Sequence, residues 1–237
     1  MTVISERQIE EAVFDSLRKT TNKFREHPYY FFTESDIQSY LYHCLYSSKF
    51  EYVRDGKRIY LLHKEYPTNF RYRKKDLIKT DIVDPIPLEK REGARGSYDF
   101  AVINPAFVQG APSCEDIVNK NVRQLENRIE NDIDLVKKEL LFAVELKYVV
   151  RNSKKYIEEI MADNKKLQFS KRWGVRHAIN LVFCNIGGSR IPEIKKAVMD
   201  APNEVCAVFI QSYYDENDRK LTPKLLGNKA FGESLSI

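Results

Sequence analysis

The chain has 237 residues, of which 43% are hydrophobic and 31% are charged. This length and composition suit one folded domain with a sizeable apolar core, and they exclude a mainly disordered chain. The 39 basic and 34 acidic residues give a formal net charge of +5, a mild excess that permits a polyanionic partner without requiring one.

Two amphipathic helices are predicted in the N-terminal part of the chain. The first covers residues 5–20, where Ser5 is a suitable N-cap and Gln8 completes a capping box. Residues 1–30, which contain this helix, are expected to form a helical extension of the domain. The second helix covers 34–46, with acidic residues in its first turn.

The residues after the second helix are expected to form strands and loops. Residues 50–66 predict a β-hairpin, because Asp55-Gly56 is a favoured two-residue turn. Pro67 is expected to end the second strand of this hairpin. Residues 66–95 predict a long charged loop, since prolines and glycines interrupt them, and residues 97–103 predict another strand.

Helices and strands alternate in the second half. An amphipathic helix is predicted over 113–140, within a helical insertion over 106–140. Strands are expected at 141–150, 178–184 and 205–211, and helices at 155–172 and 191–200. This order predicts a single α/β domain over 1–237, with a central mixed sheet between helices in a three-layer α/β/α sandwich.

The strand at 141–150 carries two charges in an otherwise apolar segment. Glu145 and Lys147 are two residues apart and therefore point to the same face of the strand. Because a buried charge is costly unless it is paired or binds a metal, this break in the apolar pattern indicates a functional site. A structural Glu–Lys pair on an edge strand is the alternative. Asp163-Asn164-Lys165 has a related spacing but is assigned to a turn or a helix surface.

A second carboxylate lies among the apolar residues of the strand at 97–103. Asp99 is expected to share one face with Ser97 and Ala101, whereas Tyr98 and Phe100 take the other face.

If the strands that carry Asp99 and Glu145 are neighbours, the two carboxylates can bind one divalent ion. Two carboxylates with waters and a phosphate oxygen are typical ligands of Mg²⁺. Lys147 would then lie beside the ion, where it could orient the attacking water and offset developing charge.

Asp99 together with Glu145-Leu146-Lys147 resembles the signature of the PD-(D/E)xK nuclease superfamily. The segments GSYDFAVI (96–103) and LFAVELKYV (141–149) resemble its second and third core strands, although Tyr98 stands where the motif has proline. The resemblance implies a restriction-endonuclease-like fold and a nuclease that uses Mg²⁺ or Mn²⁺. It also implies that Asp99, Glu145 and the Leu146 carbonyl bind the metal and that Lys147 is the catalytic lysine.

Members of that superfamily often have one more glutamate on the helix before the first core strand. Glu34 fits this position best, and Glu11 is its rival. The helix dipole alone also favours a glutamate in a first turn. Glu65, near a strand end, is a further candidate that could equally face solvent.

The expected polyanionic partner is nucleic acid, with DNA as the expected substrate. The residues expected to contact it are Arg71, Arg73, Lys74, Lys75, Lys166 and Gln168. Such contacts would make binding strongly dependent on salt, although an ordinary solvated surface is the alternative for each. A homodimer would suit double-strand cleavage. Other hypotheses are a catalytically inactive nucleic-acid-binding module and a protein-interaction module on the same fold.

The cysteines and the hydropathy pattern bear on location. No two of the four cysteines have the C-x-x-C spacing of a zinc ribbon. Cys44, Cys184 and Cys206 lie among apolar residues and predict reduced, buried thiols, which are typical of the cytosol. No signal peptide or membrane span is apparent, so we expect a cytoplasmic protein with no membrane partner.

Overall fold

The computed structural model of the chain describes residues 5–46, 50–73, 76–77, 85–86, 90, 92–111, 139–215, 220–221 and 223–228. The predicted helix over 113–140, which makes up most of the 106–140 insertion, therefore falls almost entirely outside the described residues. Lys74 and Lys75 also lie outside them.

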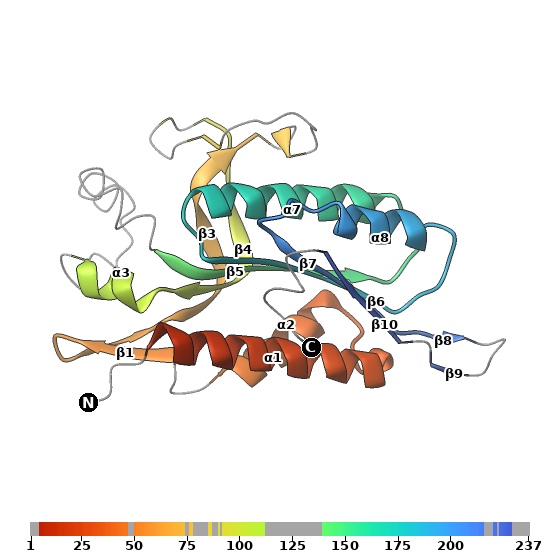
Figure 1. Cartoon of the computed structure of the whole chain (residues 1–237), viewed down its shortest axis with the longest axis horizontal. Coiled ribbons are helices and arrows are strands. Elements are labelled where there is room, and N and C mark those ends of the chain that lie inside the picture. The colour runs from red at the N-terminus through yellow and green to blue at the C-terminus, as the bar shows by residue number, and fades with distance from the viewer. Residues whose placement is uncertain are drawn as a thin grey trace.

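A mixed six-stranded sheet forms the centre of the structure (Figure 1). Its strands lie in the order β10-β7-β6-β5-β4-β3. They are β3 (Leu62–Tyr72), β4 (Ala94–Ile103), β5 (Leu140–Val149), β6 (His177–Cys184), β7 (Cys206–Gln211) and β10 (Lys224–Gly227). β5, β6 and β7 run parallel, whereas the other neighbouring pairs are antiparallel. The predicted mixed sheet is confirmed, and β5 lies inside it, as its apolar sequence indicates.

Helices cover both faces of this sheet (Figure 1). α1 (Glu6–Glu26) and α2 (Glu34–Leu45) lie on one face, and α7 (Lys155–Arg172) and α8 (Ile191–Met199) lie on the other. This α/β arrangement is compatible with a three-layer sandwich. The shorter elements are η1 (Pro28–Tyr30), β1 (Glu51–Arg54), β2 (Lys57–Tyr60), α3 (Pro105–Gly110), β8 (Tyr214–Asp215) and β9 (Lys220–Leu221).

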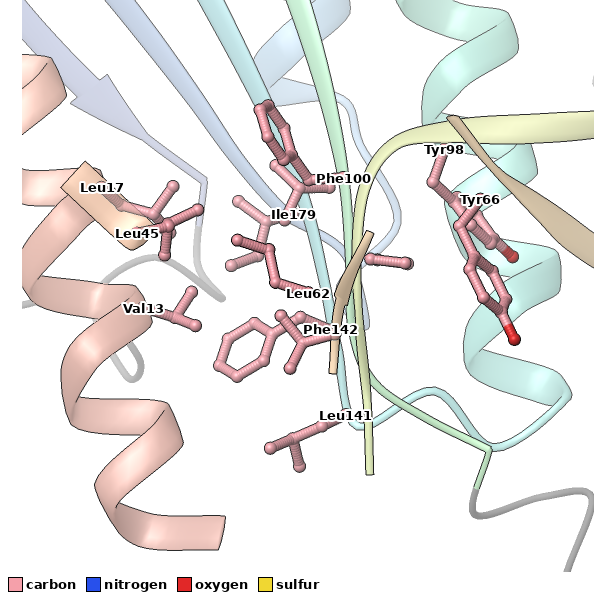
Figure 2. Packing of buried hydrophobic residues seen from close by; sticks show 14 of the residues in the cluster. Val13, Leu17, Leu45, Leu62, Tyr66, Tyr98, Phe100, Leu141, Phe142 and Ile179 are labelled. Atoms are coloured by element: carbon pink, nitrogen blue, oxygen red, sulfur yellow. The ribbon is translucent and has the colours of Figure 1, made fainter. Parts of the chain in front are cut away.

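The largest part of the core lies between α1 and the sheet. Figure 2 shows Val13 and Leu17 of α1 facing Phe142 and Ile179 across this layer. α1 begins with the predicted capping box, in which the Gln8 N–H donates to Ser5 Oγ at 3.3 Å. Within the described residues, no helix is long and apolar enough to cross a bilayer.

Two predicted boundaries are wrong. α1 continues beyond Thr20 to Glu26 because its apolar face continues, with the Phe24 ring centroid 5.1 Å from that of Phe183. β3 continues through Pro67 to Tyr72, so residues 66–72 are not a loop. Since β3 is an edge strand of the sheet, the missing N–H of Pro67 is tolerated there.

The turn predicted at Asp55-Gly56 is confirmed. It joins β1 to β2, and both of its residues have positive φ, 50° for Asp55 and 74° for Gly56. These values suit the two-residue turn that matches the twist of paired strands.

β3 and β4 bend together at Glu65 and Asp99. Glu65 has a φ of 50°. On either side of it the strands stay paired, Lys64 with Phe100 and Tyr66 with Tyr98. The Tyr98 hydroxyl lies 2.7 Å from Ser170 Oγ on α7, whereas the Phe100 ring stacks against Tyr42 of α2. Figure 2 shows the two side chains on opposite sides of the sheet. The prediction that they share a face is wrong, because the bend reverses the alternation at Asp99.

Candidate active site

β4 and β5 separate at the point where the two predicted carboxylates meet. Their paired register ends with Phe100 opposite Val144, and its continuation would place Asp99 opposite Glu145. Beyond this point, Asp99 Oδ2 accepts the Leu146 N–H at 2.6 Å, and Glu34 Oε2 accepts the Tyr148 N–H at 3.0 Å. Two carboxylates thus take the hydrogen bonds that a neighbouring strand would otherwise accept. The Leu146 carbonyl points to the same side as its N–H, toward this opening.

Glu145 is buried and paired with a lysine from α7. Lys166 Nζ lies 2.7 Å from Glu145 Oε1, and both side chains are at most 10% exposed. The same ammonium donates to the Ser97 carbonyl at 2.9 Å and lies 3.6 Å from Asp163 Oδ1. One cation therefore links α7 to both of the strands that separate here.

Lys147 is surrounded by acidic side chains. Its Nζ lies 3.6 Å from Glu34 Oε2, 3.7 Å from Glu159 Oε2 and 4.0 Å from Asp163 Oδ2. We call Asp99, Glu145, Lys147, Lys166, Glu34, Glu159 and Asp163 the charged centre. Its five carboxylates outnumber its two lysines even when the exposed Lys155, whose Nζ lies 3.2 Å from Glu159 Oε1, is added, so an additional cation would be favoured there.

Two acids of the charged centre were not predicted from the sequence. Glu159 and Asp163 lie on α7 with Lys166, at helical spacings of four and three residues that put them on one face. Asp163-Asn164-Lys165 lies on a helix, one of the two expected assignments, but its middle residue does not lie on the surface. Asn164 is buried, where it donates to the Ala197 carbonyl and accepts from Asn180. The spacing of Glu159, Asp163 and Lys166 by four and three residues is the sequence signal that could have placed them on one helix face.

Gln38 on α2 was also not predicted. Its Nε2 donates to Asp99 Oδ1 at 3.1 Å, which leaves Asp99 held between this amide and the Leu146 N–H. Both Glu34 and Gln38 lie on α2 one turn apart, so this helix positions two side chains at the opening of β5.

The other residues predicted from the sequence lie in different surroundings. Glu11 is exposed and pairs with Arg7, whereas Glu34 lies beside Lys147. Glu65 accepts from Ser97 Oγ at 2.8 Å. Gln168 is directed toward Glu204, with Nε2 3.1 Å from its Oε1, whereas Lys166 is directed into the charged centre.

Arg71 and Arg73 lie at the far end of β3 and just after it. The Arg71 main chain pairs with Ile86, and the Arg73 guanidinium lies 2.7 Å from Glu92 Oε2. Burial raises the pKa of Tyr72, which lies between them in the chain, and the charges of Lys166 and Glu145 act on it in opposite directions, so the end of β3 lies near the charged centre.

Burial and crowding of charge change the pKa values of the carboxyls. Burial raises the pKa of Asp99 to about 6, although the Leu146 N–H acts in the opposite direction. Burial also holds the pKa of Glu145 well above its usual range, and the nearby Lys166 offsets only part of this effect. Burial alone would lower the pKa of Lys147, but the charges of Asp163 and Glu34 raise it.

We expect Asp99→Asn to stabilise the protein at pH 8 by about 1–3 kcal/mol and to have little effect at pH 4. The raised pKa of Asp99 means that the folded state favours the protonated acid. The stability that Asp99 contributes is complete below its unfolded pKa and is lost as pH rises through about 6. An asparagine carries no charge and can still accept the Leu146 N–H. Urea unfolding at both pH values measures the effect, and destabilisation at pH 8 would contradict it.

Within the described part of the chain, no three histidine, cysteine, aspartate or glutamate side chains are arranged as a group that could by itself hold a metal ion. Comparisons of the chain with protein-family models, with curated proteins and with solved structures gave no match.

Proposed function

We propose that this chain is a Mg²⁺- or Mn²⁺-dependent nuclease with a restriction-endonuclease-like fold, which hydrolyses phosphodiester bonds, with DNA as its expected substrate. The observation that supports this most is the meeting of Asp99, Glu145 and Lys147 where β4 separates from β5. Three charges at the centre of an α/β fold are costly, and a ligand that carries positive charge would reduce that cost.

The residues at this opening fit a hard divalent cation. Mg²⁺ is usually bound through one or two carboxylates, with waters and phosphate oxygens completing its ligands. Asp99, Glu145 and the Leu146 carbonyl would supply the protein ligands, so a group of three acidic side chains is not needed. The excess of carboxylates and the raised pKa of Asp99 support this assignment.

A bound Mg²⁺ would supply Lewis-acid activation of water and a positive charge beside the phosphoryl group. Lys147 would orient the attacking water and stabilise the charge that develops on the phosphate. Glu34 and Glu159 hold the Lys147 ammonium from two different helices, so they act as positioning residues. Substrate phosphates would approach from the side that β4 leaves open.

A second function, catalytically inactive nucleic-acid binding, is favoured by one contact. The Lys166 ammonium lies against Glu145 Oε1 at 2.7 Å, where it already neutralises one proposed metal ligand. If that contact is permanent, the fold would retain its surface and bind nucleic acid without cutting it.

Cleavage assays separate these two functions. We expect the protein to cut single- or double-stranded DNA or RNA with Mg²⁺ or Mn²⁺, and we expect EDTA to abolish cutting. Asp99→Ala should abolish it as well, because that variant lacks a metal ligand. Asp200→Ala is the matched control, since Asp200 is an exposed aspartate at the end of α8 that pairs with Lys196. Nucleic-acid binding without cutting under any metal would favour the inactive module, and cutting in EDTA would contradict the metal-dependent mechanism.

A further inference from the structure

A groove bordered by tyrosines lies at the C-terminal end of α1, and its residue Tyr30 is four positions before Glu34 of the charged centre. Its volume is about 570 Å³, and it is formed by the end of α1, by η1 and by the β8–β9 hairpin. These segments lie side by side at one end of the sheet (Figure 1). The volume falls within the range of ligand-binding clefts, which is roughly 300–1,000 Å³.

Three tyrosine rings that line this groove are open to solvent. Tyr29 is 54% exposed, Tyr30 is 61% exposed and Tyr214 is 44% exposed. The Tyr214 N–H donates to the Tyr29 hydroxyl at 3.0 Å, and Lys23 Nζ lies 4.7 Å from the centre of the Tyr30 ring. These contacts hold the Tyr29 and Tyr30 rings in place, and part of the surface of all three rings stays exposed.

The groove and the charged centre share one anchor, Tyr148, the residue after Lys147. Its hydroxyl donates to the Phe31 carbonyl at 2.7 Å, and its N–H donates to Glu34. Tyr30 directly precedes Phe31 in the chain. Phe32, which is 82% exposed, lies between this turn and Glu34. Two exposed aromatic residues, Tyr30 and Phe32, therefore lie in the short segment between the groove and Glu34.

We infer that this groove binds unpaired nucleobases of the strand that the charged centre cleaves, so that the preferred substrate is single-stranded or has a single-stranded end. This inference rests on the proposed function. Bases in a duplex are stacked on one another and cannot reach the rings, whereas each unpaired base presents a flat face to an aromatic side chain. Lys23, His27 and one acidic residue, Glu26, also line the groove, so base stacking rather than net charge would supply most of the affinity, with Lys23 close to a backbone phosphate.

Fluorescence anisotropy with the full chain tests the inference. Labelled oligo-dT and oligo-U about 12 nucleotides long are compared with a duplex of the same length, in EDTA so that nothing is cleaved. We expect the single strands to bind at least ten-fold more tightly than the duplex. Tyr30→Ala and Tyr214→Ala should each weaken single-strand binding by about ten-fold, with no change for the duplex.

Two matched variants complete the design. Tyr30→Phe keeps the ring and should bind like wild type, which excludes a general effect of substituting this residue. Tyr46→Ala removes a 67% exposed tyrosine that does not line the groove and should also bind like wild type. Equal affinity for duplex and single strand, or unchanged binding by Tyr30→Ala, would overturn the inference.

Other occupants and a failed nuclease give distinguishable results. Self-association that Tyr30→Ala abolishes, without nucleic-acid affinity, would overturn the inference in favour of a second copy of the chain; light scattering detects it. Single-strand binding through the groove without cleavage under any metal supports base binding by the groove and overturns both the proposed nuclease and the role of the groove in cleavage. Metal-dependent cleavage with no effect of the tyrosine variants on binding supports the proposed nuclease and overturns the inference.

Discussion

Under the proposed function, replacing Lys147 with alanine is expected to lower the rate of metal-dependent cleavage by about 10²–10³-fold, the effect of removing one group that stabilises transition-state charge. The ammonium lies within 4.0 Å of carboxylate oxygens from α2 and α7. It is thus fixed beside Asp99 and Glu145 before a substrate binds. Such a preorganised charge acts mainly on the chemical step, so we expect kcat to fall more than KM rises.

Two further variants make this expectation specific. Lys147→Arg keeps the charge but not the compact ammonium, and it should recover only part of the rate. Lys196→Ala removes an exposed lysine on α8 and should leave the rate unchanged. Circular dichroism is needed for each variant, because Lys147 also offsets acidic charges in the fold. A folded Lys147→Ala variant with the wild-type rate would exclude a catalytic role for this lysine.

The second large effect concerns Lys166. We expect Lys166→Met to lower the free energy of unfolding by roughly 3–5 kcal/mol, because the change leaves a buried carboxylate without its cation. The pair is well enclosed, since Glu145 and Lys166 are 5% and 10% exposed. Lys165→Met is the matched control on the same helix, as the Lys165 ammonium lies 5.7 Å from the Phe169 ring. This control should cost less than about 1 kcal/mol.

Two measurements show whether the destabilisation by Lys166→Met comes from the uncompensated charge of Glu145. Burial raises the pKa of Glu145, so a proton can replace the lost cation at low pH. Destabilisation should therefore be smaller at pH 5 than at pH 8. Adding Glu145→Gln to Lys166→Met should recover much of the lost stability, which a double-mutant cycle measures. Under the proposed function, Mn²⁺ should raise the Tm of Lys166→Met more than that of wild type. Additive effects of the two substitutions would show that the pair is not coupled.

The sequence was most informative where a charge interrupts a local pattern. Glu145 and Lys147 were identified because β5 is otherwise apolar, and Asp99 stands out in β4 for the same reason. The choice of Glu34 over Glu11 came from the family resemblance, and the structure places Glu34 beside Lys147. For Asp99, Glu145 and Lys147, the neighbouring residues in the chain carry the information, whereas Glu34 depends on the resemblance.

Other parts of the structure depend on packing between distant segments. Charged residues on α7 have the pattern of a solvated helix face, and only the contact of α7 with β5 buries Asp163 and Lys166. Likewise, a proline usually ends a strand, but Pro67 is accommodated in β3 because that strand lies at the edge of the sheet. The bend that turns Tyr98 away from Phe100 depends on the paired bend at Glu65, which the residue type does not predict.

The charged centre has a consequence for folding. Its hydrogen bonds join residues far apart in the chain, with 114 positions between Tyr148 and Glu34 and 47 between Leu146 and Asp99. Contacts between residues so far apart in the chain form slowly, because the chain entropy is lost in closing the long loop before the contact contributes any stabilising energy. During synthesis, the centre cannot assemble until α7 has left the ribosome. A nascent chain or an N-terminal fragment that ends before α7 would therefore carry Glu34 and Asp99 without the side chains that complete the centre.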